Sequence, residues 1–349
     1  MARPKQIPGI DCDGPAADAI RVVLRTRLGE MCALRDQALN WSDPEGVHDM
    51  RVSSRRLRGA LRDFMPCLRK RKLGEVMAQV KELADALGAV RDQDVAIIAL
   101  QKLAAGAPPG PAAIVDQIMV SRESIRKQAR RDLQRTLQRL RLKQLQMDFV
   151  EAIEIATATK PGKSSNSSAH AVVSYRKIAR RTILERLKEV EDLSEGMYQP
   201  LKMKPLHQMR IAAKRLRYAL ELFEPCWGAE LSAFAKRVAA LQSSLGELHD
   251  ADIWMDTFGK HLDHIEQQPK EQKAAALWLL DHFVRLHAKH LRNTLSKWSD
   301  WEAKDVGSQI RSAVDQAVAH VGPDSSSEPV QPSVSQPSQA EKKLNQDLS

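Results

Sequence analysis

The hydrophobic pattern along the chain is helical throughout. Apolar residues recur at intervals of three and four, as in the run from Leu73 to Leu87, and no useful length alternates with a period of two. Breaks that contain proline or glycine separate these runs. The breaks lie at residues 43–44, 66, 104–111, 205, 225 and 269. The pattern predicts an all-α protein.

Two polar segments divide the chain. Residues 157–170 are rich in Ser, Gly and Pro and predict a linker, and the segment from Gly322 is rich in Ser, Pro and Gln without an apolar face. We therefore expect the following organisation: a flexible N-terminus at 1–15, a first helical bundle at 16–156, the linker at 157–170, a second bundle at 171–321 and a disordered tail at 322–349.

The strongest feature is an internal duplication. Residues 47–66, VHDMRVSSRRLRGALRDFMP, match residues 206–225, LHQMRIAAKRLRYALELFEP, with ten of twenty positions identical at an offset of 159. A second pair of blocks follows, LADALGAVRDQDV at 83–95 and LQSSLGELHDADI at 241–253. A period this long excludes a solenoid. It predicts two homologous helical bundles related by a pseudo-two-fold axis.

Basic residues recur at matching places outside these blocks. Arg21 and Arg27 correspond to Arg180 and Arg186 at the same offset. On a later basic helix, Arg126 and Arg130 are answered by Arg285 and Lys289. We interpret these recurrences as further parts of one duplicated site.

The first repeated block predicts a helix with two stripes. At helical spacing, Met50, Leu57, Leu61 and Phe64 share an apolar face, and beside it lies a basic stripe that begins with a histidine. The basic stripes are His48, Arg51, Arg55, Arg58 and Arg62 in the first copy, and His207, Arg210, Lys214 and Arg217 in the second. Asp43-Pro44 and Pro205 fit helix starts, so each histidine falls in the first turns, where the helix dipole favours an anion.

Solubility alone often places arginines on one face of an amphipathic helix. Both copies keep this stripe, however, while positions that we expect to face solvent have changed, such as Asp49 to Gln208 and Asp63 to Leu222. Guanidinium groups bind phosphate oxygens in bidentate fashion. The retained stripe therefore favours a binding function over mere solubility.

The charge balance supports an anionic partner. The chain has a net charge of +10, and residues 1–321 hold 52 basic and 40 acidic residues. Such an excess favours polyanions, although it also describes an ordinary solvated surface. Aromatic residues make up only 4% of the chain, few for stacking single-stranded bases. A polyanion without bases fits better than nucleic acid.

The second blocks contain acidic residues that allow two interpretations. Arg91, Asp92 and Asp94 correspond to His249, Asp250 and Asp252. A His-Asp pair can belong to a metal phosphohydrolase, but the first copy has an arginine there, which cannot bind a metal. We favour carboxylates that support the arginines. His282, His287 and His290 lie near one another without a partner carboxylate pattern, so no metal or other cofactor is expected.

The chain shows no sign of secretion or membrane insertion. Its first residues hold no apolar stretch that could serve as a signal, and no apolar run approaches the length of a membrane span. The four cysteines, Cys12, Cys32, Cys67 and Cys226, have no paired spacing that suggests disulfides or a zinc site. We expect a cytosolic protein.

Both histidine blocks resemble the CHAD family, the conserved histidine α-helical domain. The matching residues are His48-x-x-Arg51 with Arg55-Arg56-Leu57-Arg58, and His207-x-x-Arg210 with Lys214-Arg215-Leu216-Arg217; LGAVRDQDV and LGELHDADI resemble its second signature. The resemblance covers about residues 16–320. It implies two four-helix bundles around a basic central groove or pore, binding of inorganic polyphosphate, and association with polyphosphate granules. The chain has no ExExK signature, so it looks like a stand-alone member.

We therefore expect a non-catalytic polyphosphate-binding protein without a cofactor. The expected contacts are Arg21, Arg27, His48, Arg51, Arg55, Arg56, Arg58, Arg126, Arg130, Arg180, Arg186, His207, Arg210, Lys214, Arg215, Arg217, Arg285 and Lys289. Arg91, Asp92, Asp94, His249, Asp250 and Asp252 are expected to support them. A metal-dependent phosphohydrolase acting on a similar anion and a helical nucleic-acid-binding protein are the alternatives; granule proteins are further partners to expect.

Overall fold

The computed structural model describes residues 7–158, 173–199, 202–262 and 269–319. These residues form helices and no strand, which confirms the all-α prediction. The first half contains α1 (Ala16–Ala33), α2 (Arg35–Ala38), α3 (Pro44–Phe64), α4 (Gly74–Gly106), α5 (Pro109–Leu140) and α6 (Leu142–Thr157). The second half contains α7 (Tyr175–Glu191), α8 (Met203–Phe223), α9 (Ala229–Leu262), α10 (Lys270–Ala303) and α11 (Val306–Ala319). Four 3-10 turns lie at Met65–Cys67, Lys70–Lys72, Ser194–Tyr198 and Glu224–Cys226.

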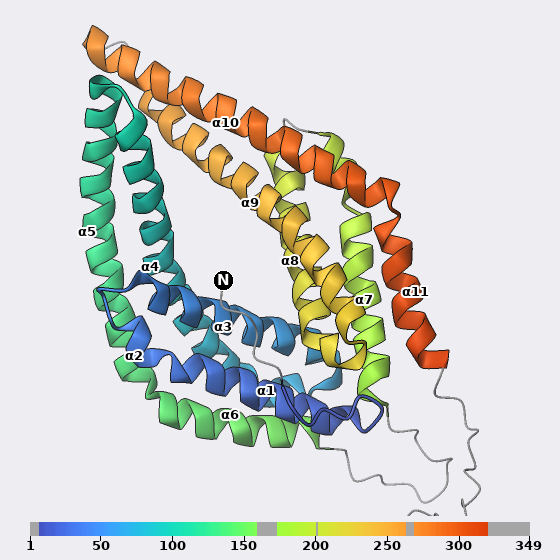
Figure 1. The fold of residues 1–349 in the computed structure, drawn as a ribbon. Helices are drawn as coiled ribbons and strands as arrows, with labels where there is room; N and C mark the ends of the chain where they lie inside the picture. Colours follow the sequence, from blue (N-terminus) through green and yellow to red (C-terminus); the bar gives the residue numbers. More distant parts are fainter. Residues whose placement is uncertain (1–6, 159–172, 200–201, 263–268, 320–349) are drawn as a thin grey trace, which may run out of the picture.

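The halves pack their helices in the same order (Figure 1). In the first half α1 contacts α3 and α6, α3 contacts α4, and α4 contacts α5. In the second half α7 contacts α8 and α11, α8 contacts α9, and α9 contacts α10. The duplication in sequence is therefore a duplication of packing. The pseudo-two-fold axis between the halves stays a prediction.

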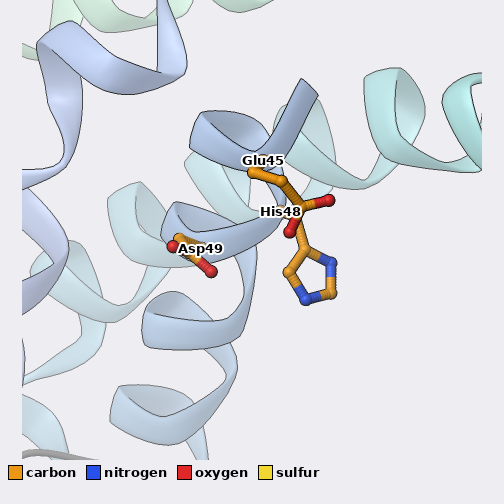
Figure 2. A group of neighbouring side chains, drawn as sticks. All are labelled: Glu45, His48 and Asp49. Carbon is orange, nitrogen blue, oxygen red and sulfur yellow. The ribbon is translucent and has the colours of Figure 1, made fainter. Parts of the chain in front are cut away.

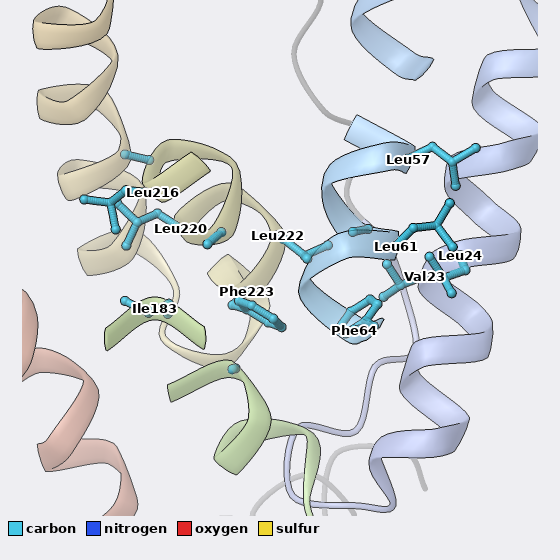
Figure 3. Close-up of a cluster of buried hydrophobic side chains, with 14 of the residues drawn as sticks. Val23, Leu24, Leu57, Leu61, Phe64, Ile183, Leu216, Leu220, Leu222 and Phe223 are labelled. Carbon is cyan, nitrogen blue, oxygen red and sulfur yellow. The ribbon is translucent and has the colours of Figure 1, made fainter. Parts of the chain in front are cut away.

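One hydrophobic core joins the halves at the base of the molecule. Phe64 at the end of α3 meets Phe223 at the end of α8, with ring centres 5.9 Å apart, and Tyr175 contacts both rings. Figure 3 shows Phe64 and Phe223 close to leucines of α3 and α8 such as Leu61 and Leu220. Phe64 and Phe223 are equivalent in the repeat, so each copy supplies the same surface to the other. The bundles thus share a core.

The halves meet again at the far end. The α4–α5 and α9–α10 hairpins run out from the base and converge at their tips (Figure 1), where α5 contacts α10. A second core lies here and is formed by Leu100, Val115, Trp254, Phe258, Leu279 and Phe283. The two hairpins are therefore fixed at both ends, which holds the helices between them in place.

The N-terminal segment differs from the prediction. Residues 7–15 were expected to be flexible, but Ile7 and Cys12 are buried, and Cys12 forms a disulfide with Cys226 at a Cα–Cα distance of 5.6 Å. The prediction without disulfides was wrong because residues 214 positions apart show no local spacing pattern. Arg176 adds a salt bridge to Asp13 at 2.7 Å.

The predicted linker and tail lie mostly outside the described residues. Thr157, placed in the linker, is the last residue of α6, and its hydroxyl accepts a hydrogen bond from Arg21. Residues 159–172 and 320–349 are not described. Each of the helices that the structure describes is too short or too polar to cross a lipid bilayer.

Candidate functional site

The two histidine helices begin at or within two residues of their predicted starts. The side chain of Asp43 accepts a hydrogen bond from the backbone N–H of Glu45 at 2.9 Å, and Pro44 opens α3. Helix α8 begins at Met203, two residues before the predicted start, with Pro205 in its first turn. His48 and His207 thus lie in the first two turns.

The basic stripes of α3 and α8 come together. We call the α3–α8 basic cluster the following residues: Arg51, Arg55, Arg58, Arg62, Arg210 and Lys214. Helices α3 and α8 are in contact, and the charges of four of these arginines act on Lys214. Burial, with these charges, lowers the pKa of Lys214 to about 8. The guanidinium of Arg55 lies 5.9 Å from the ring centre of Tyr218 on α8.

A groove of about 580 Å³ opens on this cluster between α3, the start of α4 and α8. Among the described residues that line it, none is acidic. Its basic residues are Arg55, Arg58, Arg62, Lys81, Lys214 and Arg215. Arg58 and Lys81 also pair with Asp85, at 3.9 and 3.0 Å, but the lining residues themselves are strongly cationic and suit a ligand that carries many negative charges.

Carboxylates of the second blocks support the leading arginines. Arg51 Nη2 donates a hydrogen bond to Asp92 Oδ1 at 3.0 Å. Burial lowers the pKa of Arg210, and the charge of Asp250 opposes this shift. A Cβ added at Gly88 would lie 3.7 Å from Arg51 Nε. These positions agree with the predicted supporting role of Asp92 and Asp250.

The two histidines have different neighbours. Burial and the charge of Arg91 lower the pKa of His48. His207 instead contacts His249, with ring centres 4.6 Å apart and the ring planes tilted by 48°. Burial and the charge of Arg210 lower the pKa of His249. Arg91 of the first copy corresponds to His249 of the second. The residue beside the first histidine of the stripe therefore differs between the copies.

The second aspartates of the blocks are buried beneath α5 and α10. Asp94 is 2% exposed and lies 3.5 Å from Arg126 and 3.7 Å from Arg130. Asp252 is 3% exposed and lies 3.1 Å from His287 Nε2. Burial raises the pKa of both carboxyl groups. Arg126 and Arg130 therefore pair with the buried carboxyl group of Asp94.

The register predicted for the later basic helix was wrong. His287, and not Arg285, takes the place of Arg126 against the buried aspartate. Arg285 is 79% exposed and pairs with Asp281, and Lys289 is exposed. Helices α5 and α10 differ by two residues in register, which a fixed offset of 159 does not capture. His290 also meets a carboxylate, Glu247, at 3.1 Å, contrary to the expectation for these histidines.

Arg21 and Arg180, the first recurring pair of arginines, each join two helices of their own half. Arg21 on α1 lies 3.2 Å from Glu154 on α6, and Arg180 on α7 lies 2.6 Å from Asp315 on α11. Their recurrence therefore preserves the packing of the first helix of each half against the last. The structure does not place Arg21 or Arg180 in the basic cluster.

Arg27 and Arg186 are the second recurring pair. Together with Arg56 and Arg215, they belong to ion pairs near the junction of the halves. The ion pairs include Arg27 with Glu30 at 2.8 Å, Arg186 with Asp63 at 3.0 Å and with Glu189, and Arg215 with Glu189 at 3.2 Å. Arg27 and Arg56 are buried, and the charge of Glu221 acts on Arg56. Asp63 is 2% exposed, so its change to Leu222 is not drift at a solvent position. Of these arginines, only Arg215 lines the groove.

Sequence reasoning missed two polar residues that line the groove, Lys81 and Tyr218. Lys81 lies outside both repeated blocks, so the duplication gave no signal for it. Tyr218 stands where the first copy has Gly59, and a Cβ added at this glycine would lie 3.8 Å from the tyrosine ring. The two repeated helices otherwise match, so the exchange of Gly59 for Tyr218 could have indicated from the sequence that these positions contact each other.

One group of possible metal ligands lies at the start of α3. Glu45, His48 and Asp49 project from its first turns (Figure 2), and their ligand atoms lie within 4.8 Å of one another. Arg91 lies 3.8 Å from Glu45, and its charge competes with a cation. The second copy has Lys204 and Gln208 at the positions of the two acids. The group is therefore not part of the duplicated site.

Comparison with known proteins identifies the family. The CHAD domain matches residues 22–259. The chain belongs to the CHAD family. This CHAD-domain protein is 27% identical over 295 residues to the uncharacterized protein Rv2226 of Mycobacterium tuberculosis strain H37Rv, covering 78% of the chain and 55% of the relative. It matches the uncharacterized protein MT2285 of strain CDC 1551 to the same extent. The chain thus spans about half the length of these curated relatives.

Two solved structures share the fold of this CHAD-domain protein. The CHAD domain of the plant Ricinus communis has a TM-score of 0.62 and 22% identity, covering 85% of this chain and 96% of the other. PptA from Streptomyces chartreusis has a TM-score of 0.60 and 14% identity, covering 82% and 100%. At these identities the likeness establishes the all-α fold.

Proposed function

We propose that this CHAD-domain protein binds inorganic polyphosphate along the α3–α8 basic cluster and does not hydrolyse it. The observation that carries the proposal is the convergence of two basic helices on a groove without acidic lining residues. Lys214 has no salt bridge within the described residues, and the cations around it help to lower its pKa. A polyanion would relieve this repulsion. The family resemblance points to the same ligand.

Polyphosphate fits this groove better than nucleic acid. Its chain carries one negative charge per phosphate unit and has no bases, so it needs charge-assisted contacts alone. The groove supplies six cations and one aromatic residue, Tyr218, which already lies against Arg55. Such a protein would gather on polyphosphate granules, where a fluorescent fusion can locate it.

Charge reversal in the groove tests the proposal. Arg55, Arg58 and Lys214 line the groove, and their joint replacement by glutamate should weaken binding of labelled long-chain polyphosphate at least about 100-fold, since each charge-assisted contact contributes more than a neutral one. Circular dichroism should remain unchanged. Fluorescence anisotropy at fixed salt measures the affinity.

A matched control separates the groove from overall charge. Lys127, Arg131 and Arg135 are exposed on α5, and their replacement by glutamate changes the net charge equally. This control should lose much less affinity than the groove variant. Equal losses in the two variants would mean that the whole basic surface, rather than the groove, attracts the polymer.

The phosphohydrolase alternative has one specific observation in its favour, the group Glu45, His48 and Asp49. Incubation of the protein with polyphosphate and Mn²⁺ or Mg²⁺ should release no orthophosphate if our proposal holds. Release that disappears in the double variant Glu45→Gln and Asp49→Asn would instead establish metal-dependent hydrolysis.

A further inference from the structure

The basic groove between α3, α4 and α8 runs toward the connection between α3 and α4. Its lining residues advance from Arg55 to Met65 along α3 and the 3-10 turn that follows it. On α4 they advance in the opposite direction along the chain, from Lys81 back to Gly74. Met65 and Gly74 flank residues 66–73, which form the connection. One end of the groove therefore lies at this connection.

The connection carries four consecutive cations whose side chains are exposed. We call them the 69–72 basic run: Arg69, Lys70, Arg71 and Lys72. Leu68 and Leu73, on either side of the run, are buried, and the backbone N–H of Arg69 donates a hydrogen bond to the carbonyl of Ala156 on α6 at 3.1 Å. The backbone of the run is thus anchored at both ends, while its side chains face solvent.

The cations of the run have no acidic partner. Within the described part of the chain, no carboxylate forms a salt bridge with any of the four side chains. Glu75, in the first turn of α4, is exposed and is the nearest acid that follows the run in the sequence. Adjacent like charges repel one another, and a bound polyanion would relieve this repulsion.

The second half has no counterpart of this run. At the offset of 159, its positions hold Gly228, Ala229, Glu230 and Leu231. Helix α9 begins at Ala229, soon after the 3-10 turn Glu224–Cys226, whereas the first half inserts a second 3-10 turn, Lys70–Lys72, before α4. The packing that both halves share therefore does not require these cations.

The run continues the cationic surface beyond the end of the groove. Lys70 precedes the groove-lining Gly74 by four residues. Because a 3-10 helix rises about 2 Å per residue, the turn Lys70–Lys72 stays within about 8 Å of the groove end along its axis. A polymer that leaves the groove at Arg62 and Met65 therefore meets the run next.

We propose that the 69–72 basic run is a second contact for polyphosphate, which holds the part of a long chain that extends beyond the groove and makes the protein select long chains over short ones. This inference rests on the proposed function, because it assigns the run to the same polymer. The groove between Arg55 and Arg62 follows about 10 Å of helix, so a short chain held there does not reach the run. Two contacts on one continuous chain raise its affinity without any change in the groove.

The test compares long-chain polyphosphate with inorganic tripolyphosphate. Joint replacement of Lys70, Arg71 and Lys72 by glutamine should weaken long-chain binding about tenfold, since each exposed ion pair contributes about a factor of two or three. Binding of tripolyphosphate should stay unchanged. The conservative pair Lys70→Arg and Lys72→Arg should keep both wild-type affinities. Isothermal titration calorimetry at fixed ionic strength, on the full chain, gives the two affinities.

A matched control removes the same charge from another surface. Lys127, Arg131 and Arg135 on α5 are exposed and do not line the groove, and their joint replacement by glutamine should leave the preference for long chains intact. A loss of long-chain affinity in this control as large as in the run variant would overturn the inference, because overall charge would then explain both.

The two ligands separate this inference from the proposed function. Equal losses of long-chain polyphosphate and tripolyphosphate in the run variant would overturn the inference, since the run would then act on the groove through its electric field alone. An unchanged long-chain affinity would overturn it as well. A wild-type protein that binds neither ligand would overturn the proposed function. If the triple variant does not fold, the single variants Arg71→Gln and Lys72→Gln decide, each with an expected long-chain loss of about two- to threefold.

Discussion

At the scale of single residues, Lys214 shows most clearly how the two halves create the chemistry of the site. Burial and the neighbouring arginines lower the pKa of its amine from 10.5 to about 8. Three of these arginines, Arg51, Arg55 and Arg62, belong to the other half. The repeat predicted a cation at this position but not its pKa, since the shift depends on contacts between helices that are far apart in the sequence.

This pKa predicts how polyphosphate binding depends on pH. A bound polyanion favours the protonated amine and raises its pKa, so binding takes up a proton. Affinity should fall about tenfold between pH 7 and pH 9, as Lys214 loses its charge in the free protein. In Lys214→Arg the decline should largely disappear, because a guanidinium stays charged. Titrations at constant ionic strength measure this; an identical decline in Lys214→Arg would assign it to another group.

The lowered pKa of Lys214 also affects the stability of the free protein, which should rise with pH where polyphosphate affinity falls. The unfolded chain keeps a Lys214 pKa near 10.5, so between about pH 8 and 10.5 it binds more protons than the folded chain at this site. The contribution of Lys214 to stability is therefore least favourable below pH 8 and improves as the pH rises through that range. The site is arranged for binding at some cost to the free fold.

At the scale of helices, the glycines Gly88 and Gly246 give the leading arginines of α3 and α8 their room. A Cβ added at Gly88 would lie 3.7 Å from Arg51 Nε, and one added at Gly246 would lie 3.8 Å from Arg210 Nε, both ordinary contact distances. A glycine inside a helix can mark a kink, but α4 runs unbroken from Gly74 to Gly106. The glycine makes room for a long side chain.

Substitution of these glycines should separate helix stability from binding. Gly88→Ala adds only an ordinary contact, so it should stabilise α4 by about 0.5–1 kcal/mol and leave polyphosphate affinity unchanged. Gly88→Leu should displace Arg51 from Asp92 and weaken binding several-fold. Thermal melts and anisotropy titrations give the two quantities. Gly259→Leu on α9, where no atom lies within 4 Å, is the control; a loss of binding there as large as in Gly88→Leu would contradict the explanation.

Helix-scale features were the most predictable part of this chain. The starts of α3 and α8, their two stripes and the supporting aspartates follow from 3.6-residue periodicity and from comparison of the two copies. The recurring arginines were harder to assign. Duplication preserves packing as well as binding, and Arg21 and Arg180 recur because each joins two helices of its own half. Recurrence alone does not separate these causes.

At the scale of the whole molecule, contacts between distant segments decide what the sequence could not. A pocket between the hairpins is lined by residues of α4, α9 and α10, and only the fold shows that Trp254 and Trp278 both line it. The N-terminal segment is a second example. Cys12 reaches Cys226 across the junction of the halves, and neither cysteine has a local partner pattern. Expectations from the overall composition fail where the fold brings a few tryptophans or cysteines together from distant segments.

The Cys12–Cys226 disulfide predicts a dependence of stability on redox conditions. It closes a loop of 214 residues, and a disulfide of this kind commonly contributes about 2–4 kcal/mol, in large part by restricting the unfolded chain. Reduction with dithiothreitol, or Cys226→Ser, should therefore lower the melting temperature. Polyphosphate affinity below the melting range should stay the same, because the disulfide does not line the groove. Cys67→Ser removes a cysteine that is free and exposed, and should behave as wild type. A melting temperature that is insensitive to reductant, in protein shown by thiol titration to have been oxidised, would mean that Asp13–Arg176 and the buried Ile7 hold the segment without the covalent bond.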